Sequence, residues 1–437
     1  MAQDTIYALA SGMGRAGVAV VRVSGPGVRD VAKALCDGHL SEPRRATLSS
    51  LRGSSGSVID EGLTLFFAAP NSFTGEDVVE FHVHGGRAIL EALFSAFDEF
   101  GLRVAGPGEF TRRAVENGKL DLTRAEAIAD LVNAETAAQH RQALGQYGGQ
   151  LAQLYDAWRA RLIRALAWAE AAIDFSDEEL PAGMLSSMRL MAAEILEEIQ
   201  GHLKDAHRGE RIREGIYLTV VGAPNAGKSS LVNALAKRDV AIVNSVPGTT
   251  RDVIEVRLDL DGYPVTVADT AGIRETKEAV ETEGVRRALE RARTADLVLW
   301  LRDGSLADEA MPVPSDFHAD LIVWNKADLA WPRTHEGLKL SLKTGQGLQE
   351  LLQALADRVN EKLATSSEGP VLTRQRHRKA LEDAAECLLA MLAAPAGHPE
   401  LAAEDLRLAV RAIGRITGAV DLDELLDVVF REFCVGK

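Results

Sequence analysis

The sequence predicts a multidomain protein with an α+β N-terminal domain, a helical domain, and an α/β domain inserted into the helical one. Residues 1–118 combine glycine with β-branched strand patterns, residues 119–213 and 375–437 have the apolar spacing of helices, and residues 214–374 return to an α/β pattern. A compact domain whose ends lie close together can be inserted into another domain. We therefore expect the two helical parts to form one domain around residues 214–374.

The composition is typical of a globular protein of the cytoplasm. The chain has 437 residues, of which 46% are hydrophobic and 26% are charged. It has no apolar run of 18 residues, and its N-terminus lacks the basic and apolar regions of a signal peptide, so we expect no membrane partner. The cysteines at positions 36, 387 and 434 have no CxxC spacing, which argues against a disulfide framework or a zinc site.

The formal net charge of −15 disfavours broad binding to polyanions, and we expect no DNA partner. A local basic patch can still bind nucleic acid. Residues 159–164 and 374–379 are two such candidates, and the alternative for each is a solvated helix face.

Within the N-terminal domain, residues 18–23 and 78–83 have strand patterns and residues 88–100 have a helical one. Residues 12–17 (GMGRAG) fit the dinucleotide-binding pattern GxGxxG, but a strand follows them instead of a helix, so we interpret them as a turn. Further along, apolar residues at helical spacing begin at Leu151 and continue through Trp158 and Leu166.

The strongest chemical motif is a phosphate-binding loop at residues 222–229 (GAPNAGKS). It follows a buried-strand pattern at residues 216–221 and precedes an apolar helix at residues 231–236, which is the setting that a P-loop requires. Its glycines let backbone N–H groups turn toward phosphates at the start of a helix. We expect Lys228 to contact the β- and γ-phosphates and the Ser229 hydroxyl to bind Mg²⁺.

Three later motifs predict that the base is guanine and that the domain is a Ras-like G domain. Residues 269–272 (DTAG) end one strand pattern, residues 325–328 (NKAD) follow another, and residues 341–343 (SLK) would supply the last base contact. A carboxylate at Asp328 can accept hydrogen bonds from the guanine N1–H and 2-amino group. Adenine has no such donor pair, so the carboxylate selects guanine.

Residues 244–252 (NSVPGTTRD) look like a switch segment in which Thr250 binds Mg²⁺ and senses the γ-phosphate, with a plain turn as the alternative. Together the motifs predict a nucleotide site that comprises Asn225, Ala226, Gly227, Lys228, Ser229, Ser230, Asn244, Ser245, Val246, Pro247, Gly248, Thr249, Thr250, Asp269, Thr270, Ala271, Gly272, Asn325, Lys326, Asp328, Ser341, Leu342 and Lys343.

The catalytic group for hydrolysis differs from that of Ras-like proteins. Ile273 stands where those proteins have the glutamine that orients the attacking water, and an apolar side chain cannot orient water. Asn225 can hold a monovalent cation against the phosphates. From the residues alone, the candidates for the water-orienting role remain open, with a solvated helix face as the alternative: Arg274, Glu275, Glu278, Glu281 and Glu283.

Several motifs outside the G domain are specific to one family. They are residues 71–77 (NSFTGED), 84–86 (HGG), 107–111 (PGEFT), 117–122 (NGKLDL), 125–131 (AEAIADL) and the terminal 433–437 (FCVGK). With them the chain resembles, over its whole length, the MnmE (TrmE) family of tRNA-modification GTPases.

The resemblance implies K⁺-dependent GTP hydrolysis when the G domains of a homodimer meet. It implies K⁺ ligands at Asn225, Asn244, Val246 and Thr249. It also implies that Glu281 orients the water, so the catalytic residues are expected to be Glu281, Lys228 and Asn225.

The resemblance further implies that the N-terminal domain binds 5,10-methylene- or 5-formyl-tetrahydrofolate. The family's folate-contacting positions correspond to Arg22, Glu80, Lys119 and Lys437. The expected partner protein is MnmG, which carries FAD. The two proteins would install an aminomethyl or carboxymethylaminomethyl group at C5 of the wobble uridine of certain tRNAs, with the one-carbon unit from methylene-tetrahydrofolate.

Some alternatives remain open at this stage. Arg22 faces away from Val21 and Val23 on its strand and would more often be a surface residue. Glu80, His82 and His84 share one strand face, but with no recognisable third ligand we reject a metal site there. Cys434 is either a functional thiol near the folate site or an ordinary buried one, and the residues after it do not fit a prenylation signal.

The alternative function is a regulatory or ribosome-assembly GTPase that acts as a nucleotide-dependent binding switch. An Era-type switch would carry a KH domain with a GxxG loop at its C-terminus. The helical, acidic C-terminal region lacks that loop in context, so modification of tRNA is the preferred function.

Overall fold

The computed structural model describes most of the chain. The described residues are 4–175, 183–238, 240–242, 255–268, 290, 292–306, 317–331, 337–363, 370–395, 398–420, 425–426, 429–430, 433 and 436. Among them, no helix combines the length and the apolar content that crossing a membrane requires.

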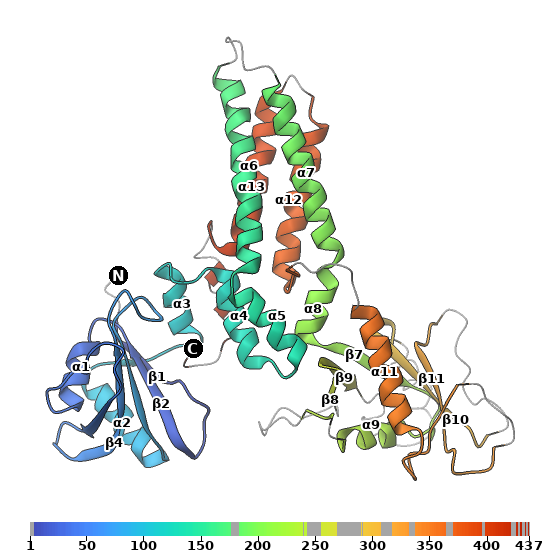
Figure 1. Cartoon of the computed structure of the whole chain (residues 1–437), viewed down its shortest axis with the longest axis horizontal. Coiled ribbons are helices and arrows are strands. Elements are labelled where there is room, and N and C mark those ends of the chain that lie inside the picture. Colours follow the sequence, from blue (N-terminus) through green and yellow to red (C-terminus); the bar gives the residue numbers. More distant parts are fainter. Residues whose placement is uncertain are drawn as a thin grey trace. The chain divides into compact units, whose positions relative to one another are not determined.

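The N-terminal domain is a six-stranded sheet with two helices on one face (Figure 1). The strand order is β3-β4-β5-β2-β1-β6, and apart from the parallel pair β1–β6 the neighbouring strands are antiparallel. The elements are β1 (Ile6–Leu9), β2 (Ala16–Ser24), α1 (Val28–Leu35), β3 (Thr47–Arg52), β4 (Val58–Phe67), β5 (Val78–Gly85), α2 (Arg87–Glu99), β6 (Arg103–Val104) and α3 (Glu109–Glu116).

The period-2 pattern of strands β2 and β5 explains this layering. Val21, Val23 and Phe81 are buried against α1 and α2, while Arg22 and Glu80 point to the opposite face. The strands predicted at residues 18–23 and 78–83 therefore exist, each slightly longer than predicted, and the helix predicted at 88–100 runs from Arg87 to Glu99.

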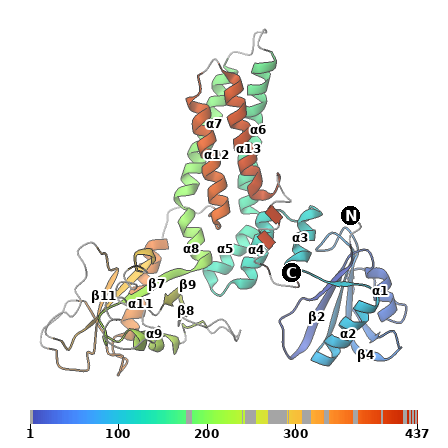
Figure 2. The same ribbon diagram turned by 180° about the vertical axis from the view of Figure 1, so that it is seen from behind.

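The helical parts precede and follow the α/β domain in the chain. They comprise α4 (Leu122–Asn133), α5 (Ala137–Tyr147), α6 (Gln150–Asp174), α7 (Met184–Lys204), α8 (Ala206–Glu214), α12 (Gln375–Ala393) and α13 (Pro399–Thr417). Helices α6 and α13 pack along each other, as Figures 1 and 2 both show. The buried residues of α6 recur every three or four positions, and several are alanines that allow close packing.

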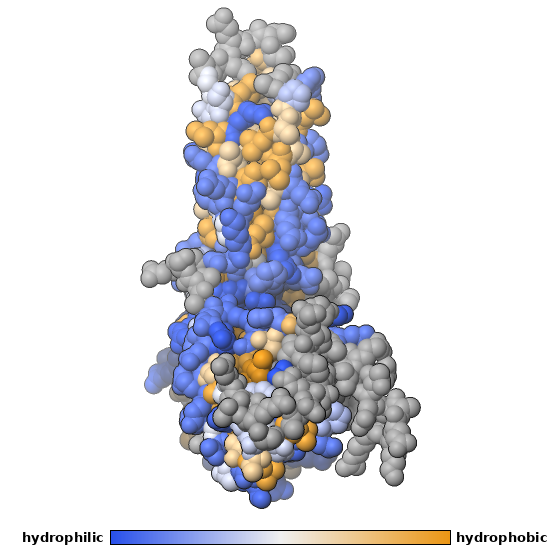
Figure 3. Space-filling model, turned by 90° about the vertical axis from the view of Figure 1, so that its right-hand side faces the viewer, coloured by the Kyte–Doolittle hydropathy of each residue, from blue (hydrophilic) through white to orange (hydrophobic). Residues whose placement is uncertain are grey.

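Apolar side chains are also exposed on the long helices. Leu389, Leu401 and Leu408 are among the exposed ones. Figure 3 shows hydrophobic residues gathered along the upper part of the long helices, with hydrophilic residues around and below them.

The α/β domain is a six-stranded sheet in the order β12-β11-β10-β7-β9-β8. All neighbouring strands are parallel except β8 and β9. Its elements are β7 (Ile216–Val221), α9 (Lys228–Ala236), β8 (Glu255–Leu260), β9 (Tyr263–Ala268), β10 (Leu297–Asp303), β11 (Leu321–Asn325), β12 (Leu338–Lys339) and α11 (Leu348–Leu363).

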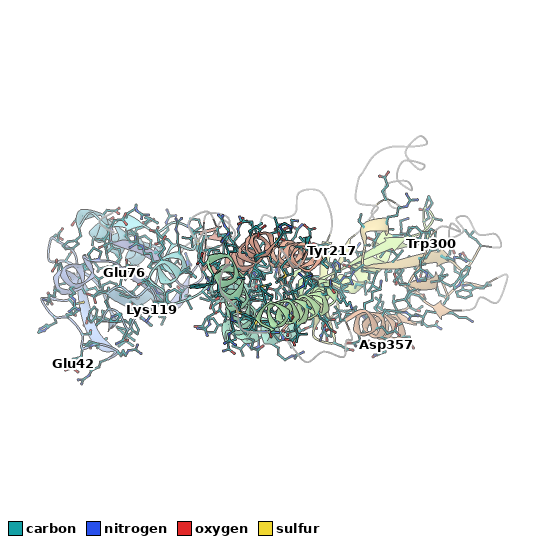
Figure 4. The ribbon with its side chains drawn as sticks, turned by 90° about the horizontal axis from the view of Figure 1, so that it is seen from above. Glu42, Glu76, Lys119, Tyr217, Trp300 and Asp357 are labelled. Carbon is teal, nitrogen blue, oxygen red and sulfur yellow. The ribbon has the colours of Figure 1, made fainter. Side chains whose placement is uncertain are left out.

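Both faces of this sheet are covered. Along β10, Leu299 and Leu301 join the core with α9 and α11, whereas Val298 and Trp300 pack on the other face with Ala292 and Phe317. Figure 4 shows Trp300 among these strands. The predicted fold class, a Ras-like α/β domain inserted into a helical domain behind an N-terminal α+β domain, is confirmed.

The chain forms two compact units, each from separate stretches of sequence. One comprises Met1–Ala129, Tyr147–Met191 and Ala390–Lys437, and the other comprises Asp130–Gln146 and Ala192–Leu389. The predicted domain boundaries at 118, 213 and 374 do not coincide with this division, and they stay a prediction.

Candidate functional site: a nucleotide loop and an N-terminal ion pair

The loop between β7 and α9 has a backbone that only its particular residues allow. Gly227 precedes α9 with φ of +107°, and Asn225 has φ of +61°. A Cβ atom on Gly227 would lie 2.4 Å from Nδ2 of Asn325, and one on Gly222 would lie 2.2 Å from the Leu301 carbonyl oxygen. These two positions therefore have no room for a side chain, because Asn325 and β10 pack directly against the loop.

The charged and hydroxyl groups of the loop lie in the first turn of α9. Nζ of Lys228 donates to the carbonyl oxygens of Gly222 and Ala223, each at 3.0 Å, so the ammonium lies over the loop. Ser229 and Ser230 are exposed in the first turn of α9. The start of a helix carries free N–H groups and a partial positive charge, so this loop fits a phosphate.

The loop follows the strand at which the order of the sheet reverses. Strand β9 lies on one side of β7 and β10 lies on the other, so the connections from β7 diverge at the end of that strand. Open α/β sheets bind ligands at such a switch point. Strand β9 ends at Ala268, which is paired with Thr219 of β7.

A group of the predicted site residues lies outside the described residues. It comprises Asn244, Ser245, Val246, Pro247, Gly248, Thr249, Thr250, Asp269, Thr270, Ala271, Gly272 and Glu281, together with the other candidates for the water-orienting role, Arg274, Glu275, Glu278 and Glu283.

Asn325 joins three of the predicted motifs. Its side chain is buried, its Nδ2 donates to the Ala226 carbonyl at 2.8 Å, and its Oδ1 accepts from the Leu342 amide at 3.3 Å. Both ends of its amide group are thus used within the protein. Asn325 holds the phosphate loop and the segment 341–343 together.

Asp328 and Ser341 also lie together. The Ser341 hydroxyl donates to Oδ1 of Asp328 at 2.7 Å, and Nζ of Lys343 lies 3.9 Å from Oδ2. The Ser341 oxygen in turn accepts from the Thr344 amide at 3.2 Å. This network fixes the orientation of the carboxylate that is predicted to recognise guanine.

Sequence reasoning missed an acidic residue beside this network. Asp303, at the end of β10, lies 2.5 Å from Nζ of Lys326 and accepts two further hydrogen bonds from Ser305. Burial alone would raise the pKa of Asp303, but these hydrogen bonds outweigh burial and the pKa lies below its ordinary value. The sequence did carry one indication of this residue. Asp303 ends a buried-strand pattern, and the next strand along the chain leads into the 325–328 motif.

In the N-terminal domain, the structure brings together two of the predicted folate residues. Arg22 and Glu80 are directly opposite each other on β2 and β5, and their side chains form an ion pair at 2.8 Å. The guanidinium lies 5.4 Å from the centre of the Phe73 ring and 5.6 Å from that of Phe110. Arg22 is therefore a partly buried residue with defined partners.

The histidines on β5 have separate partners. Nε2 of His82 lies 3.6 Å from Oε2 of Glu80, whereas Nδ1 of His84 lies 2.9 Å from Asp60. Among the described residues, no group of three or more metal-ligating side chains is present.

Of the other folate candidates, only Lys119 belongs to the described residues. Nζ of Lys119 donates to the Pro70 carbonyl at 2.9 Å, and Figure 4 shows Lys119 in the N-terminal domain. Cys434 and Lys437 lie outside the described residues. Gly436 is described, and a Cβ atom on it would lie 2.2 Å from the carbonyl oxygen of Leu9 in β1. The C-terminal end of the chain therefore contacts the N-terminal domain.

Several of the family-specific motif residues have structural roles. Glu76 accepts from Ser24 at 2.6 Å and pairs with Arg113, which also bonds Asp4 and Glu109. Burial alone would raise the pKa of Glu109, but hydrogen bonds from Arg103, the Gly106 amide and Arg113 lower it below its ordinary value. These charges anchor the loop 71–77 and helix α3 to the sheet.

The basic segment 374–379 is largely neutralised by carboxylates. Arg374 pairs with Asp130 at 2.8 Å, Arg378 lies 3.5 Å from Glu210, and Lys379 pairs with Asp383 at 2.8 Å. Arg374 is 12% exposed, so it is neither a solvated residue nor a free nucleic-acid contact.

Comparison with known proteins identifies the family. Residues 5–119 match the model described as the GTP-binding protein TrmE N-terminus, and residues 122–434 match the MnmE helical domain. Among solved structures, the G domain of the T. maritima FeoB iron transporter aligns with 33% of this chain and 98% of its own, at 22% identity and a TM-score of 0.23.

Curated relatives match over the full length. The tRNA modification GTPase MnmE of Paramagnetospirillum magneticum is 53% identical, over 99% of this chain and 100% of the relative. The MnmE of Parvibaculum lavamentivorans is 52% identical with the same coverage, and that of Rhodospirillum rubrum is 50% identical over 100% of both chains. The chain therefore belongs to the MnmE (TrmE) family of tRNA modification GTPases.

Proposed function

We propose that this protein binds and hydrolyses GTP and uses this reaction in the modification of tRNA. The observation that carries the proposal is the junction at Asn325, which joins the phosphate loop to Leu342 while Ser341 holds Asp328. The carboxylate of Asp328 can accept two hydrogen bonds from guanine, and a base without those donors would leave it unpaired. Membership of the MnmE family supports tRNA as the substrate.

For hydrolysis we assign roles to residues of the loop and of the switch segments. Lys228 would contact the β- and γ-phosphates, and the hydroxyls of Ser229 and Thr250 would hold Mg²⁺, which neutralises phosphate charge when bound. Glu281 would orient the attacking water, since Ile273 cannot. The exposed Asn225, an amide in a left-handed turn, would contribute its oxygen to K⁺ together with Asn244, Val246 and Thr249.

The N-terminal domain would bind a tetrahydrofolate derivative, as the 5,10-methylene or 5-formyl form. The Arg22–Glu80 pair supports this, because it offers an acceptor next to a cation that lies near two aromatic rings. Lys119 and Lys437 would complete the site. When bound, the methylene form supplies a one-carbon unit.

We further propose that the chain acts as a homodimer with an FAD-carrying partner, MnmG. Together they would modify C5 of the wobble uridine with an aminomethyl or carboxymethylaminomethyl group. The dimer would bring two G domains together for hydrolysis.

Mass spectrometry of nucleosides from tRNA tests the proposal. Cells that lack the gene should lose the C5-modified uridine, the intact gene should restore it, and a Lys228→Ala variant should not. Intact modification in the deleted cells would refute the tRNA role. Intact modification together with defective ribosome assembly would favour the regulatory alternative.

A further inference from the structure

The turn that follows β10 lies against the segment 325–328. Asp303 and Asn325 are paired in the parallel register of β10 and β11, and the Gly304 amide donates to the Asn325 carbonyl at 3.0 Å. The turn therefore supports a segment that belongs to the proposed nucleotide site, although nothing in the sequence motifs assigns a role to it.

The side chain of Lys326 is held by the carboxylate of Asp303. Its Nζ lies 2.5 Å from Oδ2, and the Asp303 side chain is only 9% exposed. The other oxygen, Oδ1, accepts from the amide of Ser305 at 3.0 Å and from its hydroxyl at 2.6 Å. Both oxygens of Asp303 are thus used, and its position is fixed from the turn side.

The backbone of Lys326 is held as well. Lys326 has φ of +68°, a left-handed conformation that is unfavourable for a residue with a side chain. Its carbonyl accepts from the indole Nε1 of Trp331 at 2.9 Å. The indole packs on Gly304 so closely that a Cβ there would lie 2.4 Å from it. A strained residue held at both its side chain and its carbonyl lies two positions before Asp328.

We propose that Asp303 is a positioning residue of the guanine-nucleotide site. By holding Lys326, it keeps the segment 325–328 in its strained conformation and so presents Asp328 to the base. Asp303 acts through Lys326 and does not touch the nucleotide. The inference rests on the proposed function in one respect, namely that this domain binds guanine nucleotides. A binding site that is already ordered needs less free energy to bind its ligand. Removing the Asp303–Lys326 contact should therefore make the protein release its nucleotide faster.

Asp303→Asn is the appropriate variant, because it keeps the size and an acceptor oxygen for Ser305 but removes the charge that faces Lys326. Loss of a charge-assisted hydrogen bond changes an equilibrium constant by about 10- to 100-fold. If the bond stabilises only the nucleotide-bound protein, GDP should dissociate about 10- to 100-fold faster. The rate of hydrolysis of bound GTP in a single turnover should not change. Stopped-flow release of a fluorescent GDP analogue from the full-length protein measures the first quantity, and quenched-flow measures the second.

A double-mutant cycle separates positioning from a general loss of stability. In a Lys326→Met background, Asp303→Asn should have no further effect on GDP dissociation. Asp320→Asn is the matched control, because Asp320 also pairs with a lysine, Lys362 at 3.1 Å, and also accepts a backbone amide at 2.8 Å. It should leave GDP dissociation unchanged.

Each outcome decides the question. If the wild-type protein holds no GDP, the proposed function fails. If the wild-type protein holds GDP and the Asp303→Asn protein releases it at the same rate, the positioning role is wrong. The role is also wrong if the effects of Asp303→Asn and Lys326→Met on GDP dissociation simply add. If Asp303→Asn does not fold, Ser305→Ala replaces it. Loss of the Ser305 hydroxyl should speed GDP release by about fivefold, and an unchanged rate would overturn the inference.

Discussion

Replacing Asn325 with alanine tests the central feature of the nucleotide site. The substitution removes the bond from Nδ2 to the Ala226 carbonyl at 2.8 Å and the bond from the Leu342 amide to Oδ1 at 3.3 Å. Asn325 is 4% exposed, so water does not readily replace the lost partner. We expect GDP binding to weaken because two segments of the site lose their connection.

The magnitude follows from the number and length of these bonds. A typical hydrogen bond contributes about 0.5–1.5 kcal/mol net, and a buried group left without a partner costs about 1–3 kcal/mol. The longer bond to Leu342 is the weaker one. We therefore expect the substitution to remove about 2–4 kcal/mol of stabilising free energy. If all of this loss appears in GDP binding, the affinity should fall by about 30- to 1,000-fold.

The assay is equilibrium binding of GDP and of xanthosine diphosphate, with urea unfolding of the G domain measured in parallel. Because Asn325 acts between protein segments, both nucleotides should weaken together and the ratio of their affinities should stay as it is. Asp328→Asn should instead shift preference toward xanthine, because it changes the group that faces the base. Asn360→Ala is the control, since Asn360 makes one 3.3 Å bond to Asp261 at the protein surface.

Two results would refute this reasoning. One is an Asn325→Ala protein that binds GDP as tightly as the wild type. The other is a measurable change in the ratio of the two affinities, which would mean that Asn325 contacts the base.

Three further predictions concern catalysis and the N-terminal domain. GTP turnover should be on the order of 10²-fold faster in K⁺ than in Na⁺, and Asn225→Ala should abolish the difference; equal rates in the two salts for the wild type would remove Asn225 as a cation ligand. Glu281→Ala should retain GTP affinity and lower kcat about 10²- to 10⁴-fold, and normal turnover would exclude Glu281 from the site. Because the folded-state pKa of Glu109 lies below its ordinary value, its stabilising contribution is complete above the unfolded pKa and is lost as the pH falls through the folded one. The protection factors of residues 103–116, which compare the observed hydrogen exchange with the intrinsic rate at the same pH, should therefore fall below about pH 4, and they should depend less on pH in Glu109→Gln.

The phosphate loop could be predicted from the sequence because its geometry is set by neighbours along the chain. Gly227 adopts its left-handed φ at the start of α9 as the motif requires, and Lys228 lies over the same loop. The order of the motifs along the chain likewise predicted a G domain, and the terminal and N-terminal motifs indicated the family that the comparisons then identified.

The roles inside each motif could not be predicted in the same way. Asn325 stays a predicted nucleotide contact, and the sequence did not indicate that its amide group also joins two protein segments. In the N-terminal domain, Glu76 belongs to a family motif, yet it forms part of a buried charge cluster with Arg113. A motif gives the residue type, but the partner of a side chain depends on what the fold places beside it.

What the sequence by itself determined is local: the strand–loop–helix arrangement of the phosphate loop and the alternation of Arg22 with buried valines. What only the tertiary structure decided is which distant residues meet. Arg22 meets Glu80 because β2 and β5 pair in one register, and Asp303 meets Lys326 because β10 and β11 end side by side. Strand register depends on packing across the whole sheet, and a shift of one residue would turn these side chains to the other face.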